Sequence, residues 1–332
     1  MLTLKIWKYV SLPWLLLSVL FFTSFIFLSF FKGTEIEYLT NSYLLGLFRN
    51  TFLLSLLTAL ISCLIAVPLA ILVTFYNFPG SKFFSWALSL SIAFPAYVYA
   101  FIFVGIFEFS SPVASFLRDL NIILPSIKNL FGASIIMSMA LFPYIFLLVK
   151  VQLLSTGINL FKASKTLGNN NITSIFKVII PSVMPAIIAG MALIIFETIA
   201  DFGGVSTLRI ETFTVGIYNA WFGYQSYFSA ARLAGFLLLF VLVIIGITKY
   251  FGTSNLASKT SETFVKINLN NFYSYVASIV CFLLFMIVFI IPLIQLIIWN
   301  LQLNNLISFE NLNLLFNSVT LGVLASVLTV FF

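Results

Sequence analysis

Two carboxylates stand out among the residues that could do chemistry. Glu197 and Asp201 are four positions apart at the end of a long apolar run, so a helix would place both on one face. Carboxylate oxygens are hard ligands that suit hard cations, and ionisable groups near membrane depth are candidates for function. We consider the pair as candidates for a translocation path. The alternatives are two helix-end charges facing water, or an ion pair between Glu197 and Arg209.

The remaining side chains do not suggest enzymatic catalysis. The chain has no histidine, which is the usual proton shuttle and the commonest metal ligand. Cys63 and Cys281 both lie inside apolar runs, which favours packing residues over a disulfide or a metal site. Neither a nucleophile–base pair nor a glycine-rich phosphate loop is present. The sequence therefore predicts no catalytic residues and no cofactor.

The composition indicates that lipid is the main solvent of this chain. Hydrophobic residues make up 62% of it, charged residues only 8%, and Phe alone supplies 40 of the 332 residues. A soluble domain has about 25% charged residues. The net charge of +7 comes from 16 Lys and Arg residues scattered between apolar runs, whereas a nucleic-acid site needs clustered bases. We expect a membrane protein that contacts lipid and binds no nucleic acid.

Apolar runs long enough to span a bilayer recur along the chain, and a helix is the natural choice because lipid offers no partners for backbone groups. The first run is preceded by Lys5 and Lys8 and resembles a signal peptide, but its length favours an uncleaved span. The predicted spans are 12–31, 52–75, 84–107, 133–151, 181–199, 230–250, 273–299 and an eighth that begins near 315.

The distribution of bases predicts the orientation. With the N-terminus in the cytoplasm, alternation places ten of the 16 Lys and Arg residues on the cytoplasmic side. The expected location is a bacterial inner membrane, crossed several times.

An internal repeat suggests two halves. Asn50 and Thr51 open the second span, and Asn317 and Ser318 open the eighth in the same relative position. Transporters are often built from such repeats. We expect a first six-span half at 1–250, a cytoplasmic linker at 251–272 and the start of a second half at 273–332. Because the last residues fall in mid-span, we expect the second half to be truncated here.

A basic segment between the fourth and fifth spans is the most informative part of the sequence. It reads as a short amphipathic helix, a Gly-Asn-Asn-Asn turn at 168–171, and a second helix that leads into the membrane near Pro181 and Pro185. Phe176, Ile179 and Ile180 have the spacing of one helical face. An ordinary basic loop at the headgroups is the alternative.

This segment resembles the cytoplasmic coupling loop of binding-protein-dependent ABC importer permeases, whose pattern is Glu-Ala-Ala, three residues, Gly, nine residues and Ile-x-Leu-Pro. Lys162 and Ser164 depart from the pattern. The resemblance implies a type I permease fold, two copies of an ATP-binding cassette subunit inside and a periplasmic solute-binding protein outside. The seven positions aligned with the pattern, the two departures included, are Lys162, Ala163, Ser164, Gly168, Val178, Ile180 and Pro181.

Other segments are similar to ferric-iron importer permeases, which fuse two six-span halves. The most specific are Ala200-Asp201-Phe202-Gly203 and the Thr-x-Gly-Ile-Tyr-x-x-Trp-Phe segment at 214–222. The resemblance implies ferric iron as substrate and ATP hydrolysis on a separate chain. Thiamine permeases share the fused layout and are the nearest rival. A transporter driven by an ion gradient is an alternative of another class, although the centres of the spans hold almost no acids.

Overall fold

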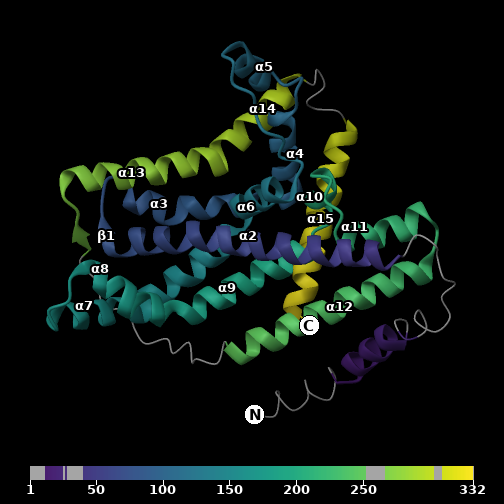
Figure 1. Cartoon of the computed structure of the whole chain (residues 1–332), viewed down its shortest axis with the longest axis horizontal. Helices are drawn as coiled ribbons and strands as arrows, with labels where there is room; N and C mark the ends of the chain where they lie inside the picture. Colours follow the sequence, from purple (N-terminus) through teal and green to yellow (C-terminus); the bar gives the residue numbers. More distant parts are fainter. Residues whose placement is uncertain (1–11, 25–26, 28–39, 252–265, 303–308, 332) are drawn as a thin grey trace. The chain divides into compact units, whose positions relative to one another are not determined.

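A computed structural model describes residues 12–24, 27, 40–251, 266–302 and 309–331 (Figure 1). The chain divides into two compact units, Met1–Phe289 and Ile290–Phe332. The predicted all-α architecture is confirmed, since the described residues form helices and two strands of two residues each. Parts of the predicted first span (25–26 and 28–31) and of the predicted linker (252–265) lie outside the described residues.

The helices and strands of the first unit follow in chain order. They are a helix at Leu12–Ser24, α2 (Asn41–Phe75), β1 (Tyr76–Asn77), α3 (Ser81–Ala87), the 3₁₀ helix η1 (Leu88–Ala93), α4 (Ala96–Phe107), α5 (Pro112–Asp119), α6 (Leu130–Gln152), the π-helical turn η2 (Leu153–Gly157), α7 (Ile158–Thr166), α8 (Asn171–Ser174), the π-helical turn η3 (Ile175–Ile179), α9 (Ile180–Ala200), α10 (Gly203–Thr207), α11 (Phe213–Tyr218), the π-helical turn η4 (Asn219–Gly223), α12 (Tyr227–Phe251), β2 (Ile267–Asn268) and α13 (Asn271–Phe285).

The second unit holds α14 (Ile291–Gln302) and α15 (Phe309–Phe331), and a π-helical turn, η5 (Met286–Ile290), crosses the boundary between the units. The repeat residues Asn317 and Ser318 lie in α15, and the described side chains of that helix are exposed. The division into two six-span halves remains a prediction.

Seven helical runs among the described residues are long and apolar enough to cross a membrane, so the chain is a multi-pass membrane protein. They match seven of the eight predicted spans in order. These runs are Asn41–Phe75, Ala96–Asp119, Leu130–Ser155, Asn171–Ala200, Tyr227–Gly246, Asn271–Gln302 and Leu312–Thr329.

The predicted span at 84–107 was wrong in detail, because the structure interrupts it. α3 and η1 end before Pro95, and α4 begins only after it. Phe94 is extended, with φ −97° and ψ 123°, as expected for a residue that precedes proline. The membrane-length run accordingly starts at Ala96 rather than at 84.

The core of the first unit is formed by α2, α6 and α9, which pack against one another. Small polar residues line the α2 face of this core at helical spacing, and Ser62 Oγ donates to the Ser138 carbonyl of α6 at 3.5 Å. Small side chains allow membrane helices to approach closely. A Cβ on Gly190 of α9 would lie 2.8 Å from Ile145 Cγ1 of α6, so this crossing requires glycine. The polar stripe on α2 consists of Thr51, Ser55, Thr58 and Ser62, all buried.

Candidate functional site

The segment that resembles a coupling loop consists of two short helices, α7 and α8, joined by a tight turn. Gly168 adopts φ +84°, a left-handed conformation that glycine accepts without strain. The Gly168 amide donates to the Lys165 carbonyl at 3.0 Å, and the Asn169 amide donates to the Ser164 carbonyl at 3.2 Å. This is the Schellman arrangement that ends a helix. The predicted helix–turn–helix is thus confirmed, with Gly168 at the position that fixes the turn.

A chain of side-chain hydrogen bonds closes the turn. Asn169 Nδ2 donates to Ser164 Oγ at 3.2 Å, the hydroxyls of Ser164 and Ser174 lie 2.9 Å apart, and Ser174 Oγ donates to the Asn170 carbonyl at 2.9 Å. Because the single proton of Ser174 goes to Asn170, Ser164 must donate to Ser174. Both serines are buried. Ser164, which departs from the family pattern, therefore links α7 to α8.

Aromatic stacking attaches this segment to the end of α2. The rings of Phe161 and Phe75 are stacked with centroids 5.0 Å apart, and both are buried. Ile158 and Ile179 are buried as well. In Figure 1 the α7 and α8 labels lie together at the left, near β1. We call this part of the first unit the α7–α8 end.

The opposite surface of the segment is apolar and exposed. Leu167, Ile172 and Phe176 are 82%, 69% and 66% exposed. The expected common face of Phe176 with Ile179 and Ile180 was wrong, because Ile179 is fully buried. A π-helical turn, η3, covers 175–179, and its wider spacing no longer aligns residues three and four positions apart.

The seven positions aligned with the coupling-loop pattern differ in exposure. Ser164 is buried and Val178 and Ile180 are half-buried, so three of the seven contribute to packing. Lys165 and Lys177 are also exposed, which adds two bases to the apolar surface. The segment can therefore offer a partner an apolar surface with a basic rim. Of the seven aligned positions, the exposed ones are Lys162, Ala163, Gly168 and Pro181.

Glu197 and Asp201 have different environments at the other end of α9. Glu197 is exposed in the last turn, whereas Asp201 caps the C-terminus of α9 in an extended conformation. Asp201 Oδ2 accepts from the Val205 amide at 3.2 Å, so this carboxylate also caps α10. Burial raises the pKa of Asp201, backbone hydrogen bonds from Val205 and Gly204 oppose the rise, and the charge of Glu197 adds to it.

The two glycines after Asp201 are explained by close packing. A Cβ on Gly204 would lie 2.5 Å from Asp201 Oδ2, and a Cβ on Gly203 would lie 2.7 Å from Tyr97 Cβ of α4. The Thr214 hydroxyl donates to the Asp201 carbonyl at 2.9 Å, which attaches α11 to the same turn. The Asp-Phe-Gly-Gly segment is thus a structural junction of α4, α9, α10 and α11.

Asn50 and Thr51 have a role that the sequence did not reveal. Asn50 Nδ2 donates to the Glu211 carbonyl at 3.0 Å, and the Phe213 amide donates to Thr51 Oγ1 at 3.1 Å. The loop before α11 is thus fixed to α2. The predicted alternative partner of Glu197, Arg209, lies in this loop with φ +59°. Among the described residues, the ion pair found is Lys128–Glu108 and not Glu197–Arg209.

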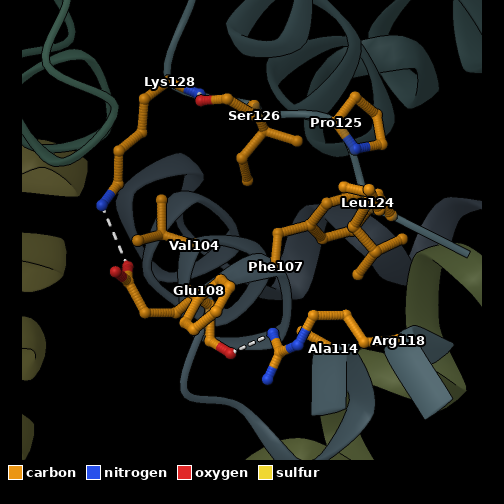
Figure 2. A pocket seen from close by; sticks show the side chains of 12 residues that line it. Val104, Phe107, Glu108, Ala114, Arg118, Leu124, Pro125, Ser126 and Lys128 are labelled. Carbon is orange, nitrogen blue, oxygen red and sulfur yellow. Dashed lines mark hydrogen bonds and ion pairs between the residues drawn. The ribbon is translucent and has the colours of Figure 1, made fainter. Parts of the chain in front are cut away.

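A cavity of about 260 Å³ lies between the end of α4, α5 and the loop that follows α5 (Figure 2). Lys128 Nζ and Glu108 Oε2 form an ion pair at 2.9 Å across it. The Arg118 guanidinium donates to the Phe109 carbonyl at 2.6 Å and lies 3.8 Å from the centroid of that ring. These contacts hold the loop together and leave no unpaired carboxylate in this cavity wall for a cation.

The described residues contain no group of three or more His, Cys, Asp or Glu side chains that could hold a metal ion. Glu197 and Asp201 together supply two carboxylates, one of which is engaged in capping.

Comparison with known proteins gives two kinds of similarity. No family model matches the sequence. The chain is 26% identical over 211 residues to the Fe(3+)-transport system permease protein FbpB 2 of Haemophilus influenzae, which covers 64% of this chain and 38% of the relative. It is 25% identical over 169 residues to the sulfate transport system permease protein CysT of Salmonella typhimurium, covering 51% of this chain and 60% of the relative. The chain thus spans 38% of the first relative and 60% of the second, less than two thirds of either.

Solved structures show the same fold. A bacterial alginate ABC transporter in complex with an alginate pentasaccharide-bound periplasmic protein superposes with a TM-score of 0.58 at 15% identity, covering 76% of this chain and 97% of the other. A second alginate importer structure gives 0.55 at 18% identity, covering 75% and 98%. The chain therefore has the fold of an ABC transporter permease, and its relatives in sequence are transport permeases.

Proposed function

We propose that this chain is the permease subunit of an ATP-driven ABC importer in a bacterial inner membrane, with its N-terminus in the cytoplasm. The observation that carries the proposal is the α7–turn–α8 segment, whose Schellman turn at Gly168 stands at the family spacing from Pro181. An exposed apolar surface with basic residues around it suits docking into a groove of a partner. The partner would be an ATP-binding cassette subunit in two copies, with ATP hydrolysis there.

We propose ferric iron as the substrate, delivered by a periplasmic solute-binding protein. This proposal is supported by the similarity to FbpB 2, which extends over 211 residues. It is also supported by the Asp201 junction, because the segments that resemble ferric-iron permeases are those that build it.

Sulfate is the second candidate substrate, since several relatives are sulfate permeases. The two substrates have opposite charge, so each would need side chains of the opposite sign along its path, including near Glu197 in the last turn of α9. An exposed Glu197 favours a cation over a sulfate dianion at this position.

Uptake in cells distinguishes the candidates. Cells that lack their own ferric and sulfate importers would receive the complete transport system with or without this chain. Radiolabelled ferric iron, sulfate and thiamine would then be offered separately. Iron uptake that requires the chain is the expected result. Sulfate or thiamine uptake would keep the permease assignment and overturn the substrate. Failure of this chain to co-purify with an ATP-binding subunit would overturn the importer itself and favour a gradient-driven transporter.

A path role of the two carboxylates has its own test. Glu197→Gln removes an exposed charge whose side chain makes no hydrogen bond within the described residues, whereas Asp201→Asn keeps an oxygen that can accept from Val205. If the pair guides a cation, Glu197→Gln lowers iron uptake several-fold while the protein level and the melting temperature stay unchanged. Unchanged iron uptake in the Glu197→Gln, Asp201→Asn double variant would exclude the role.

A further inference from the structure

Three lysines from distant parts of the chain come together at the α7–α8 end. Lys82 belongs to α3, Lys150 to the last turn of α6, and Lys266 lies just before β2. Lys150 Nζ donates to the Ser85 carbonyl of α3 at 2.5 Å, and Lys266 Nζ donates to the Val73 carbonyl of α2 at 2.6 Å. These contacts attach Lys150 to α3 and Lys266 to the end of α2, and Lys82 is the second residue of α3 itself.

The backbone supports this arrangement. β1 and β2 pair in parallel, with Tyr76 opposite Ile267, and Asn77 Nδ2 donates to Asn268 Oδ1 at 3.0 Å. The Ser278 hydroxyl of α13 donates to the Pro79 carbonyl at 2.7 Å, so the start of α13 also joins the turn. The cluster is therefore built from α2, α3, α6, β2 and α13 rather than from one mobile side chain.

The positive charges of the cluster are not balanced within the described part of the chain. None of Lys82, Lys150 and Lys266 forms an ion pair with a carboxylate there. Burial lowers the pKa of Lys266, and the charges of Lys150 and Lys82 lower it further, so both of these ammonium groups act on Lys266. Lys150 and Lys266 each use one hydrogen bond on a carbonyl, which leaves two N–H donors on each.

Exposed tryptophan and tyrosine side chains lie on α3 and α13, two of the helices that build the cluster. Trp86 of α3 is 54% exposed, and Tyr273 and Tyr275 in the first turn of α13 are similarly exposed. Tryptophan and tyrosine gather where a membrane meets water, because one end of the side chain is apolar and the other polar. The rings of Phe83 and Phe285 lie 5.4 Å apart and hold α3 against α13.

From this juxtaposition we infer that Lys82, Lys150 and Lys266 bind the phosphate of an anionic phospholipid headgroup. Basic pockets between membrane helices on the cytoplasmic side recognise such headgroups. The lysines supply charge and N–H donors, and the aromatic residues contact the upper part of the acyl chains. The inference rests on the proposed orientation, which puts the α7–α8 end on the cytoplasmic side, and not on the proposed substrate. A bound lipid would steady the end of α2, on which Phe161 of α7 stacks.

Native mass spectrometry of the purified full-length chain in neutral detergent tests the site. Phosphatidylglycerol and phosphatidylcholine would be titrated separately, and the affinity ratio taken for each variant. We expect preferential binding of phosphatidylglycerol. A surface-proximal lysine contributes about fivefold to the affinity for anionic lipid, so Lys82→Gln, whose side chain is exposed, is expected to weaken binding about fivefold. The triple variant K82Q/K150Q/K266Q is expected to lose at least tenfold.

The controls separate charge from folding and lipid from other anions. K165Q/K177Q, which removes two exposed bases of the α7–α8 segment, is expected to keep the preference for phosphatidylglycerol. Lys82→Arg is expected to keep it as well, because arginine retains the positive charge that Lys82→Gln removes. Unchanged phosphatidylcholine binding and melting temperature show that the triple variant folds. Equal phosphatidylglycerol affinity in the triple variant and the wild type would overturn the inference. Displacement of the lipid by millimolar inorganic phosphate would assign a soluble anion instead. Loss of ATP-binding subunit retention with unchanged lipid binding would assign the lysines to that protein contact.

Discussion

The hydroxyl pair of Ser164 and Ser174 allows a quantitative test of how α7 and α8 are held together. Ser174→Ala leaves the buried Ser164 proton without its acceptor, and Ser164→Ala removes the acceptor of Asn169 Nδ2. A hydrogen bond of this kind contributes about 1 kcal/mol net, and an unsatisfied buried partner costs about 1–3 kcal/mol. Removing both hydroxyls together takes away the pair without leaving the Ser164 donor unpaired. The double variant is therefore expected to be less destabilised than the sum of the single variants, by about 1 kcal/mol.

Hydrogen exchange measured by mass spectrometry reports the local stability of the α7–α8 segment. The amides of 158–175 in each single variant are expected to exchange at least fivefold faster than in the wild type, since about 1 kcal/mol corresponds to that factor. Ser182→Ala is the matched control, because its hydroxyl bonds only the Ile179 carbonyl within the same helical run. Wild-type exchange in both single variants, or strictly additive effects in the double variant, would refute the linkage of α7 to α8 through these hydroxyls.

Three further predictions concern the packing of the first unit. Gly190→Ala places a Cβ 2.8 Å from Ile145 Cγ1 and 2.9 Å from its Cα, so we expect destabilisation of about 1–3 kcal/mol, seen as a lower melting temperature in detergent. Thr51→Val removes the acceptor of the Phe213 amide at nearly constant volume, and faster exchange at that amide, with little change in α6, is expected. The raised pKa of Asp201 means that the folded state holds this proton more tightly than the unfolded state. The stability that this proton contributes is present below the ordinary pKa of 3.8 and is lost as the pH rises through the raised pKa. The melting temperature of the wild type relative to Asp201→Asn should therefore fall as the pH rises from 3.8 through the raised pKa. A difference between the two proteins that does not depend on pH would contradict this.

The sequence alone determined the membrane class and most of the helices. Spans of about 20 apolar residues must be helical in lipid, because backbone groups there find no other partners. The same kind of reasoning predicted the helix–turn–helix in the segment 161–181, since a glycine at the end of an amphipathic stretch is typical of a helix C-terminus. The prediction of one continuous span at 84–107 failed at Pro95. The run is continuous and apolar, but the extended backbone of Phe94 before the proline ends the helix there.

Tertiary structure decided what the polar residues do. Composition could not distinguish Glu197 from Asp201, but packing leaves one exposed and makes the other a cap for α10. The lysine cluster could not be found from the sequence, because Lys82, Lys150 and Lys266 are far apart in the chain and meet only through the β1–β2 pairing and the ends of α2 and α6. The physical reason is that hydrophobic periodicity is a local property fixed by helix geometry, whereas the environment of a charge depends on contacts between segments that the local pattern does not specify.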